Sequence, residues 1–94
     1  MTTAKVYKPV GRLDGVTAAA TEKEILALLV DGVSVVSIDL SELDYVSSAG
    51  LRVLLVSAKA AKAKGGKLVL LSPKPAILEV LTISGFDKIL EVKF

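Results

Sequence analysis

The sequence contains neither cysteine nor histidine. Without cysteine, the chain can form no disulfide, no thiolate nucleophile and no zinc–thiolate site. Without histidine, it lacks the general base of an ordinary Ser-His-Asp triad and the commonest nitrogen ligand of metal ions. Most hydrolase mechanisms are therefore excluded, and we expect no catalytic residue, no bound metal and no cofactor.

Long apolar runs are also missing. Asp, Glu or Lys interrupts every longer hydrophobic stretch before it reaches membrane-spanning length, and Met1–Pro9 has no apolar segment of the signal-peptide kind. The balance of 12 basic and 10 acidic residues gives a net charge of +2, which is too small to indicate nucleic acid or an anionic membrane as a partner. We therefore expect a cytoplasmic protein that neither inserts into a membrane nor binds nucleic acid directly.

What is present is typical of a small folded domain. Of the 94 residues, 52% are hydrophobic and 23% are charged, whereas aromatic residues make up only 4%. A chain of this length buries about 60 to 65% of its unfolded surface, which supports one core but leaves no room for a second. Residues 1–94 are accordingly predicted to form a single domain.

Three segments are predicted to be strands: Lys5–Leu13, Val33–Leu40 and Lys67–Leu71. Pro9 cannot donate a hydrogen bond to a neighbouring strand, so the first should lie at a sheet edge. A short last strand or extended tail is expected over Lys88–Phe94. The second strand alternates, and its more apolar face carries Val36, Ile38 and Leu40. Unequal faces favour an α/β fold with helices mainly on one face of a mostly parallel sheet, since two covered faces would give continuous apolar runs.

The first helix has two candidate starts. Asp14 or Thr17 could cap it, whereas Thr21, with a glutamate three residues later, offers a capping box and a later start. The alanines at 18–20 favour helix, so we take the earlier start. Gly32 is predicted to end this helix.

Apolar residues recur at three- and four-residue steps from Ser48 to about Lys64, which predicts a second helix that Gly65-Gly66 ends. Lysines near its C-terminal end complement the helix dipole, and binding of an acidic partner is the alternative. Pro75 should begin a third helix that ends at Gly85 and is closed by Phe86. The predicted core comprises Val36, Ile38, Leu40, Leu51, Leu54, Leu55, Leu68 and Leu70.

Ser47 and Ser48 lie where a strand and a polar turn lead into the second helix. Spacing alone favours one of them as the N-cap, and the alternative is a phosphorylation site, because backbone N–H groups and the helix dipole tolerate an anion there. Asp39 and Ser41 precede them, and we expect both to support the turn. A receiver-type phosphoaspartate at Asp39 lacks the acidic pair that would bind magnesium.

The segment from Asp39 to Leu51 resembles the signature of STAS domains, specifically that of bacterial anti-sigma-factor antagonists. The resemblance continues at Gly11-Arg12-Leu13-Asp14, Gly65-Gly66, Ser72-Pro73 and Ser84-Gly85-Phe86-Asp87, and so covers nearly the whole chain. It implies a short superhelix of strand–helix units, with about four strands. It also implies that Ser48 is the phosphoacceptor, whereas Ser47 stands where many members have Asp.

The same resemblance implies a module, not an enzyme, whose unphosphorylated form binds an anti-sigma-factor serine kinase and releases a sigma factor, with a phosphatase reversing the switch. The expected partner-binding residues are Ser47, Ser48, Ala49, Gly50 and Arg52. A STAS subunit of a lipid-transport or stressosome-like assembly is the alternative. Two further alternatives are an enzyme with Ser48 as nucleophile and a packing or dimerisation domain without a switch.

Family members often begin with an extra strand that forms a hairpin with the one at Lys5–Leu13, and few residues precede that segment here. The sequence therefore leads us to expect an uncovered edge or sheet face, which favours self-association as a homodimer.

Overall fold

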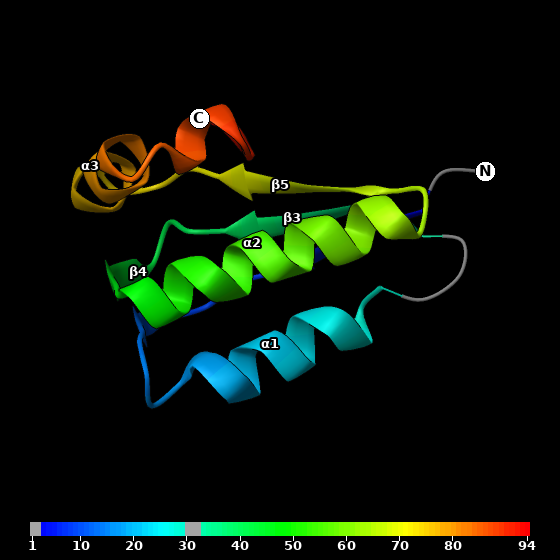
Figure 1. Ribbon diagram of the computed structural model, residues 1–94, viewed down its shortest axis with the longest axis horizontal. Helices are drawn as coiled ribbons and strands as arrows, with labels where there is room; N and C mark the ends of the chain where they lie inside the picture. Colours follow the sequence, from blue (N-terminus) through cyan, green and yellow to red (C-terminus); the bar gives the residue numbers. More distant parts are fainter. Residues whose placement is uncertain (1–2, 30–32) are drawn as a thin grey trace.

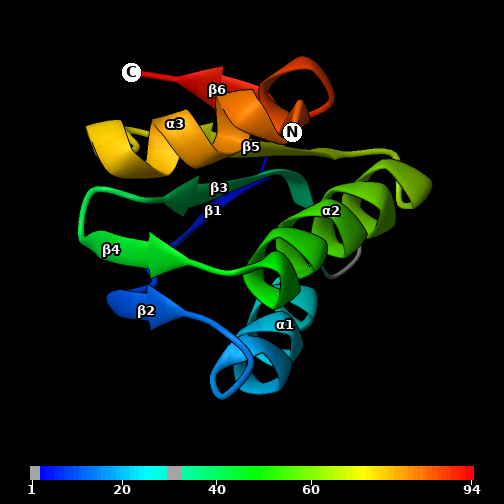
Figure 2. The same ribbon diagram turned by 60° about the vertical axis from the view of Figure 1, so that its left-hand side comes forward.

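The computed structural model describes residues 3–29 and 33–94. In chain order, the elements of this part of the chain are β1 (Thr3–Tyr7), β2 (Gly11–Leu13), α1 (Ala18–Ala27), β3 (Val33–Asp39), β4 (Leu43–Val46), α2 (Ser48–Ala63), β5 (Lys67–Leu71), α3 (Pro75–Ile83), the 3-10 turn η1 (Phe86–Lys88) and β6 (Glu91–Lys93). Within these residues, β1, β3, β5 and β6 form a four-stranded sheet in the order β1-β3-β5-β6, and every pair is parallel. Figures 1 and 2 show the arrangement.

The expected single strand over Lys5–Leu13 is wrong: the segment forms two strands that belong to different sheets. Residues 8–10, including Pro9, separate the two strands, and Gly11 at the start of β2 has a φ of +81°, which the left-handed region allows for glycine. The first part, β1, pairs only with β3 among the described strands, so the expected edge position is confirmed.

Sequence reasoning missed β4, because the segment after Leu40 was interpreted as a polar turn. Leu43 and Val46 are buried in β4, whereas the two residues between them are exposed, so the alternation that marks a half-buried strand is absent. β4 pairs in parallel with β2 in a two-stranded sheet, with Leu13 opposite Val46. This second sheet brings the residues around Leu13 beside the strand that leads into α2.

The earlier start of α1 is confirmed. The helix begins after Thr17, and the side chain of Thr17 makes no cap hydrogen bond. Instead, Asp14 Oδ1 accepts the backbone N–H groups of Val16 at 3.0 Å and Thr17 at 3.2 Å. α1 ends at Ala27, and the expected stop at Gly32 lies outside the described residues.

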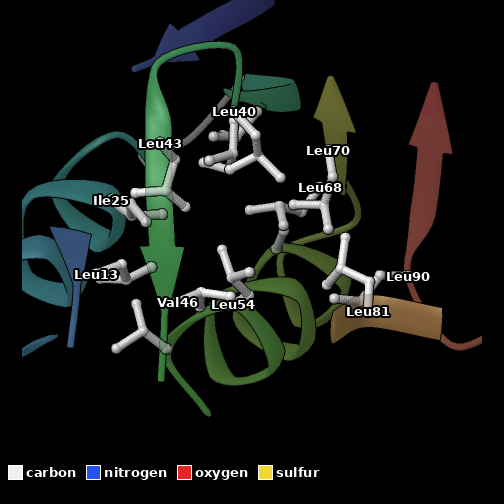
Figure 3. Close-up of a cluster of buried hydrophobic side chains, with 14 of the residues drawn as sticks. Leu13, Ile25, Leu40, Leu43, Val46, Leu54, Leu68, Leu70, Leu81 and Leu90 are labelled. Carbon is white, nitrogen blue, oxygen red and sulfur yellow. The ribbon is translucent and has the colours of Figure 1, made fainter. Parts of the chain in front are cut away.

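All three described helices contribute side chains to one buried cluster on the same face of the sheet (Figure 3). Ile25 of α1, Leu54 of α2 and Leu81 of α3 belong to it, together with the predicted face of β3. Val69 points to the opposite face of β5 and is buried outside this cluster. Helices mainly on one face are therefore confirmed, as is the α/β architecture.

The buried face of α2 differs in part from the prediction. Leu54 is fully buried as expected, but Leu51 and Leu55 are only half-buried. The helix buries instead its smaller residues, namely Gly50, Val53, Ser57 and Ala61. Small side chains allow the helix to lie close to the sheet, and Leu51 and Leu55 therefore lie at the edges of this contact.

The ends of α2 and α3 agree with the sequence. After α2, Gly65 has a φ of +81°, and the N–H of Gly66 donates to the carbonyl of Ala61 at 2.9 Å, which closes the helix. After α3, Gly85 has a φ of +78° and Phe86 packs on the core. The last segment forms the short strand β6. Across the described residues, no helix is both long and apolar enough to span a bilayer.

Candidate functional site

The turn between β3 and β4 is supported by a side-chain hydrogen bond. Asp39 Oδ1 accepts the backbone N–H of Ser41 at 2.9 Å. The hydroxyl and the backbone N–H of Ser41 lower the pKa of the Asp39 carboxyl, because both stabilise its charged form. The backbone N–H of Leu43 then donates to the carbonyl of Leu40 at 3.1 Å and completes the turn. Asp39 and Ser41 thus direct the chain from β3 into β4 and on toward α2.

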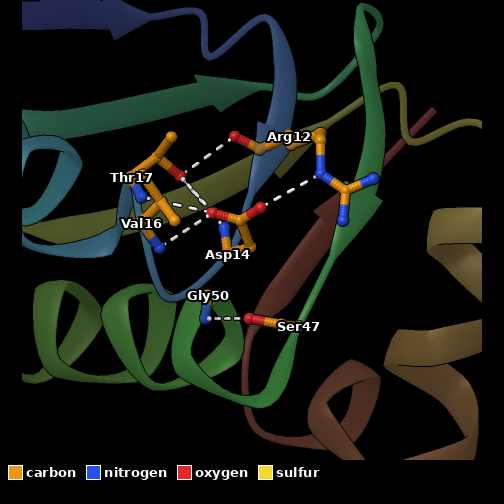
Figure 4. A network of polar contacts seen from close by, with 6 residues as sticks. All are labelled: Arg12, Asp14, Val16, Thr17, Ser47 and Gly50. Atoms are coloured by element: carbon orange, nitrogen blue, oxygen red, sulfur yellow. Dashed lines mark hydrogen bonds and ion pairs between the residues drawn. The ribbon is translucent and has the colours of Figure 1, made fainter.

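Ser47 is the N-cap of α2, which settles the choice that spacing left open between the two serines. Its backbone is extended, with φ −95° and ψ 178°, and its Oγ accepts the backbone N–H of Gly50 at 3.3 Å (Figure 4). Its own N–H donates to the carbonyl of Leu13 at 2.9 Å. Ser47 therefore joins the start of α2 to β2, and it is half-buried.

Gly50 allows the first turn of α2 to lie directly on the two-stranded sheet. A Cβ at this position would come within 2.5 Å of the Leu13 carbonyl oxygen and 2.8 Å of the side chains of Leu13 and Val46. No side chain other than hydrogen fits without a shift of the backbone. Gly50 is buried and positions α2 on the two-stranded sheet, and its expected part in partner binding stays a prediction.

Ser48 is the first residue of α2, and its side chain is exposed. Arg52 is also exposed and lies one turn further along the helix, on the same side as Ser48. Together with Ala49, these residues form one wall of an open groove of about 410 Å³ between the starts of α1 and α2. The groove is lined by Ala18, Ala19, Glu22, Ser48, Ala49, Arg52 and Val53. We call it the Ser48 groove.

A polar network missed by sequence reasoning lies beside this turn. Arg12 Nε donates to Asp14 Oδ2 at 3.0 Å (Figure 4). The guanidinium carbon of Arg12 also lies 4.2 Å from the centre of the Tyr45 ring. The Arg12 guanidinium, with the N–H groups of Thr17 and Val16, lowers the pKa of the Asp14 carboxyl. These contacts link β2, β4 and the start of α1. The sequence does not reveal the contact between Arg12 and Tyr45, because the two residues are far apart in the chain and only the pairing of β2 with β4 places them side by side.

The chemistry available at the Ser48 groove is that of an accessible hydroxyl. Among the described residues, no hydrogen bond joins Ser48 to a carboxylate or an amine that could act as its general base. The positive end of the α2 dipole and the Arg52 guanidinium both favour an anion at Ser48, whereas Glu22 across the groove opposes it. In residues 3–29 and 33–94, no group of three or more acidic side chains converges to hold a metal ion.

The structure is that of a small parallel α/β domain in which a strand leads into a capped helix that begins with an exposed serine. The model of the STAS domain family matches residues 2–94, and the chain belongs to that family. A Bordetella bronchiseptica protein that is assigned by name to the anti-sigma factor antagonists, BtrV, is 44% identical over 82 residues, which cover 87% of this chain and 71% of that protein.

Solved structures share the fold. The crystal structure of a Thermotoga maritima protein assigned to the same class matches with a TM-score of 0.86 at 23% identity, over 95% of this chain and 77% of that one. The structure of a sulfate transporter family protein from Wolinella succinogenes matches almost as well, with a TM-score of 0.83 at 17% identity, over 96% of this chain and 75% of that one. The fold therefore occurs in proteins of different function, and likeness at this level of identity identifies the fold alone.

Proposed function

We propose that this protein is an anti-sigma factor antagonist: a cytoplasmic, non-catalytic binding module that a phosphate on Ser48 switches off. In its unphosphorylated form it binds an anti-sigma factor with serine kinase activity and thereby releases a sigma factor. The observation that carries this proposal is the 44% identity to a protein assigned to that class, over 87% of the chain. It favours this role over a subunit of a lipid-transport or stressosome-like assembly, which the fold alone would also allow.

The accessibility of the two serines supports Ser48 as the phosphoacceptor. Ser48 is exposed, whereas Ser47 is half-buried and its Oγ is engaged with the N–H of Gly50. A kinase must bring the hydroxyl to the terminal phosphate of ATP, and only the hydroxyl of Ser48 is available without opening the helix cap. Phosphorylation of Ser48 leaves the cap at Ser47 intact, so the fold persists while the surface changes.

The switch acts through charge and hydration. A phosphate adds about −1.5 to −2 charges at neutral pH. At the first residue of α2 this charge is tolerated in the free protein, because it faces the positive end of the helix and Arg52 lies one turn away. A partner docked over the Ser48 groove would have to desolvate the phosphate, which costs several kcal/mol unless the partner supplies a cation. Phosphorylation thus weakens docking without unfolding the module, and a phosphatase restores it.

The test uses the purified protein, its anti-sigma factor kinase and ATP, with phosphate located by mass spectrometry and affinity measured by calorimetry. Ser48→Ala should bind the kinase but accept no phosphate. Ser48→Asp should stay folded and bind about 1 to 3 kcal/mol more weakly, since its carboxylate carries part of the charge of a phosphate. Ser47→Ala is the matched control and should still be phosphorylated at Ser48. Phosphate on Ser47 alone, or wild-type affinity of Ser48→Asp, would refute the switch.

A further inference from the structure

The C-terminal half of α2 borders a second open groove, which the proposed switch does not use. It has a volume of about 470 Å³ and lies between α2, the start of β5 and the segment from η1 to β6. We call it the lysine-rimmed groove. It is lined by Leu55, Ala58, Lys59, Lys62, Gly66, Lys67, Leu68, Ile89, Leu90 and Glu91.

The floor and one wall of this groove are apolar. Leu68 and Leu90 are buried at its base, while Leu55 and Ala58 of α2 are half-buried along one side. Ile89 stands opposite with 64% of its surface exposed. A single exposed aliphatic residue is ordinary on a protein surface, but here several side chains gather around one hollow, which is typical of a docking site.

The rim is basic. Between Asp44 and Glu79 the chain has no acidic residue, so every charged side chain of α2 and β5 is basic. Lys59 and Lys62 are exposed, lie three residues apart on the same side of α2, and no described acidic side chain approaches either within salt-bridge distance. Lys67 Nζ forms an ion pair with Glu91 Oε1 at 3.3 Å across the groove, so the charge of Lys67 is partly neutralised. The positive charge thus concentrates on the α2 side.

We propose that the lysine-rimmed groove docks an amphipathic, acidic helix of a partner protein, whose apolar side chains contact Leu55, Ala58 and Ile89 while its carboxylates contact Lys59 and Lys62. Charge complementarity favours an acidic partner, and the apolar wall favours an amphipathic helix. The open shape favours a helix over a small ligand, because small-ligand sites enclose most of their occupant.

This surface is separate from the Ser48 groove and does not depend on the proposed switch. Ser48 and Lys62 are at opposite ends of α2, about 20 Å apart along the helix axis. The two grooves also have different neighbours, because the Ser48 groove is bounded by the start of α1, whereas the lysine-rimmed groove is bounded by the start of β5 and by residues 89–91. One partner helix in the lysine-rimmed groove therefore leaves Ser48 accessible.

The probe is a synthetic peptide with leucines at i, i+3, i+4 and i+7 and glutamates on its other faces, and a scrambled peptide of equal composition is the control. Titration into nitrogen-15-labelled protein, followed by NMR, should shift the amide signals of residues 55–62 and 89–91 and leave those of 47–50 unchanged. Shifts confined to residues 47–50, or equal shifts with the scrambled peptide, would overturn the proposal.

Variants test the contributions of the lysines and of the apolar wall to peptide binding separately. Lys59→Glu with Lys62→Glu should weaken peptide binding at least about tenfold, because two attractive charges become repulsive. Ile89→Ser, at an exposed position that the fold does not need, should also weaken it severalfold. Lys23→Glu reverses one lysine charge on α1, away from the groove, and should bind as wild type does. Equal affinities for all four proteins, or binding to vesicles of anionic phospholipid in the absence of any peptide binding, would overturn the proposal.

Discussion

The two ends of α2 present different surfaces to the solvent. At the N-terminal end, backbone touches backbone: Ser47 donates to Leu13, and Gly50 leaves no space for even a methyl group. At the C-terminal end, Gly66 also lies against backbone, that of Val33 and Ser34, but the last turns of the helix border an open groove with exposed lysines. A closely fitted end can hold a serine in a constant position for a kinase and a partner. An open, apolar and charged end can adapt to a docking segment.

The centre of α2 connects these ends, and its loss should have the largest effect. Leu54 is fully buried, so Leu54→Ala should lower the free energy of unfolding by about 2 to 5 kcal/mol through lost burial and the cavity left behind. Lys62→Ala, on the exposed C-terminal turn, should change it little. Urea denaturation of the two variants measures the difference. Equal midpoints would mean that α2 does not depend on the shared core.

Gly50 and Gly65 differ in the space around them, so alanine at each position should have a different cost. Gly50→Ala should cost about 3 kcal/mol, because the new methyl group meets the Leu13 carbonyl, which cannot move without shifting β2. Gly65→Ala meets no atom within 4 Å and should cost only about 1 kcal/mol, from the strain of its left-handed backbone. Thermal and urea unfolding report both values. A Gly65→Ala variant as unstable as Gly50→Ala would reverse the comparison.

The adjacent serines should differ in their contribution to stability. Ser47→Ala removes the hydrogen bond to Gly50 and should lower the free energy of unfolding by about 1 kcal/mol. Ser48→Ala, at the exposed first residue of the helix, should change it by less than about 0.5 kcal/mol. The opposite order in the same denaturation experiment would identify Ser48 as the cap instead.

Much of the fold follows from local pattern. The strands β3 and β5, the bounds of α2, and the glycines that end α2 and α3 were all predictable, because periodicity and left-handed stops act within a few residues. The division of Lys5–Leu13 into β1 and β2 was not. Its two halves carry no local mark of belonging to different sheets, and only the pairing of β2 with the short strand β4 separates them.

The candidate site divides in the same way. The sequence alone identified the serine pair at a helix start, because a short polar side chain is favoured at the N-cap. The spacing could not say which serine caps the helix, since that depends on how α2 leaves β4 and lies against β2 through contacts between residues distant in the chain. For the same reason, the sequence could not show that Gly50 lies against Leu13 and Val46, or that the polar residue Ser57 is fully buried. Local sequence therefore determines which residue types stand at the site, whereas packing between distant segments determines which of their side chains face solvent.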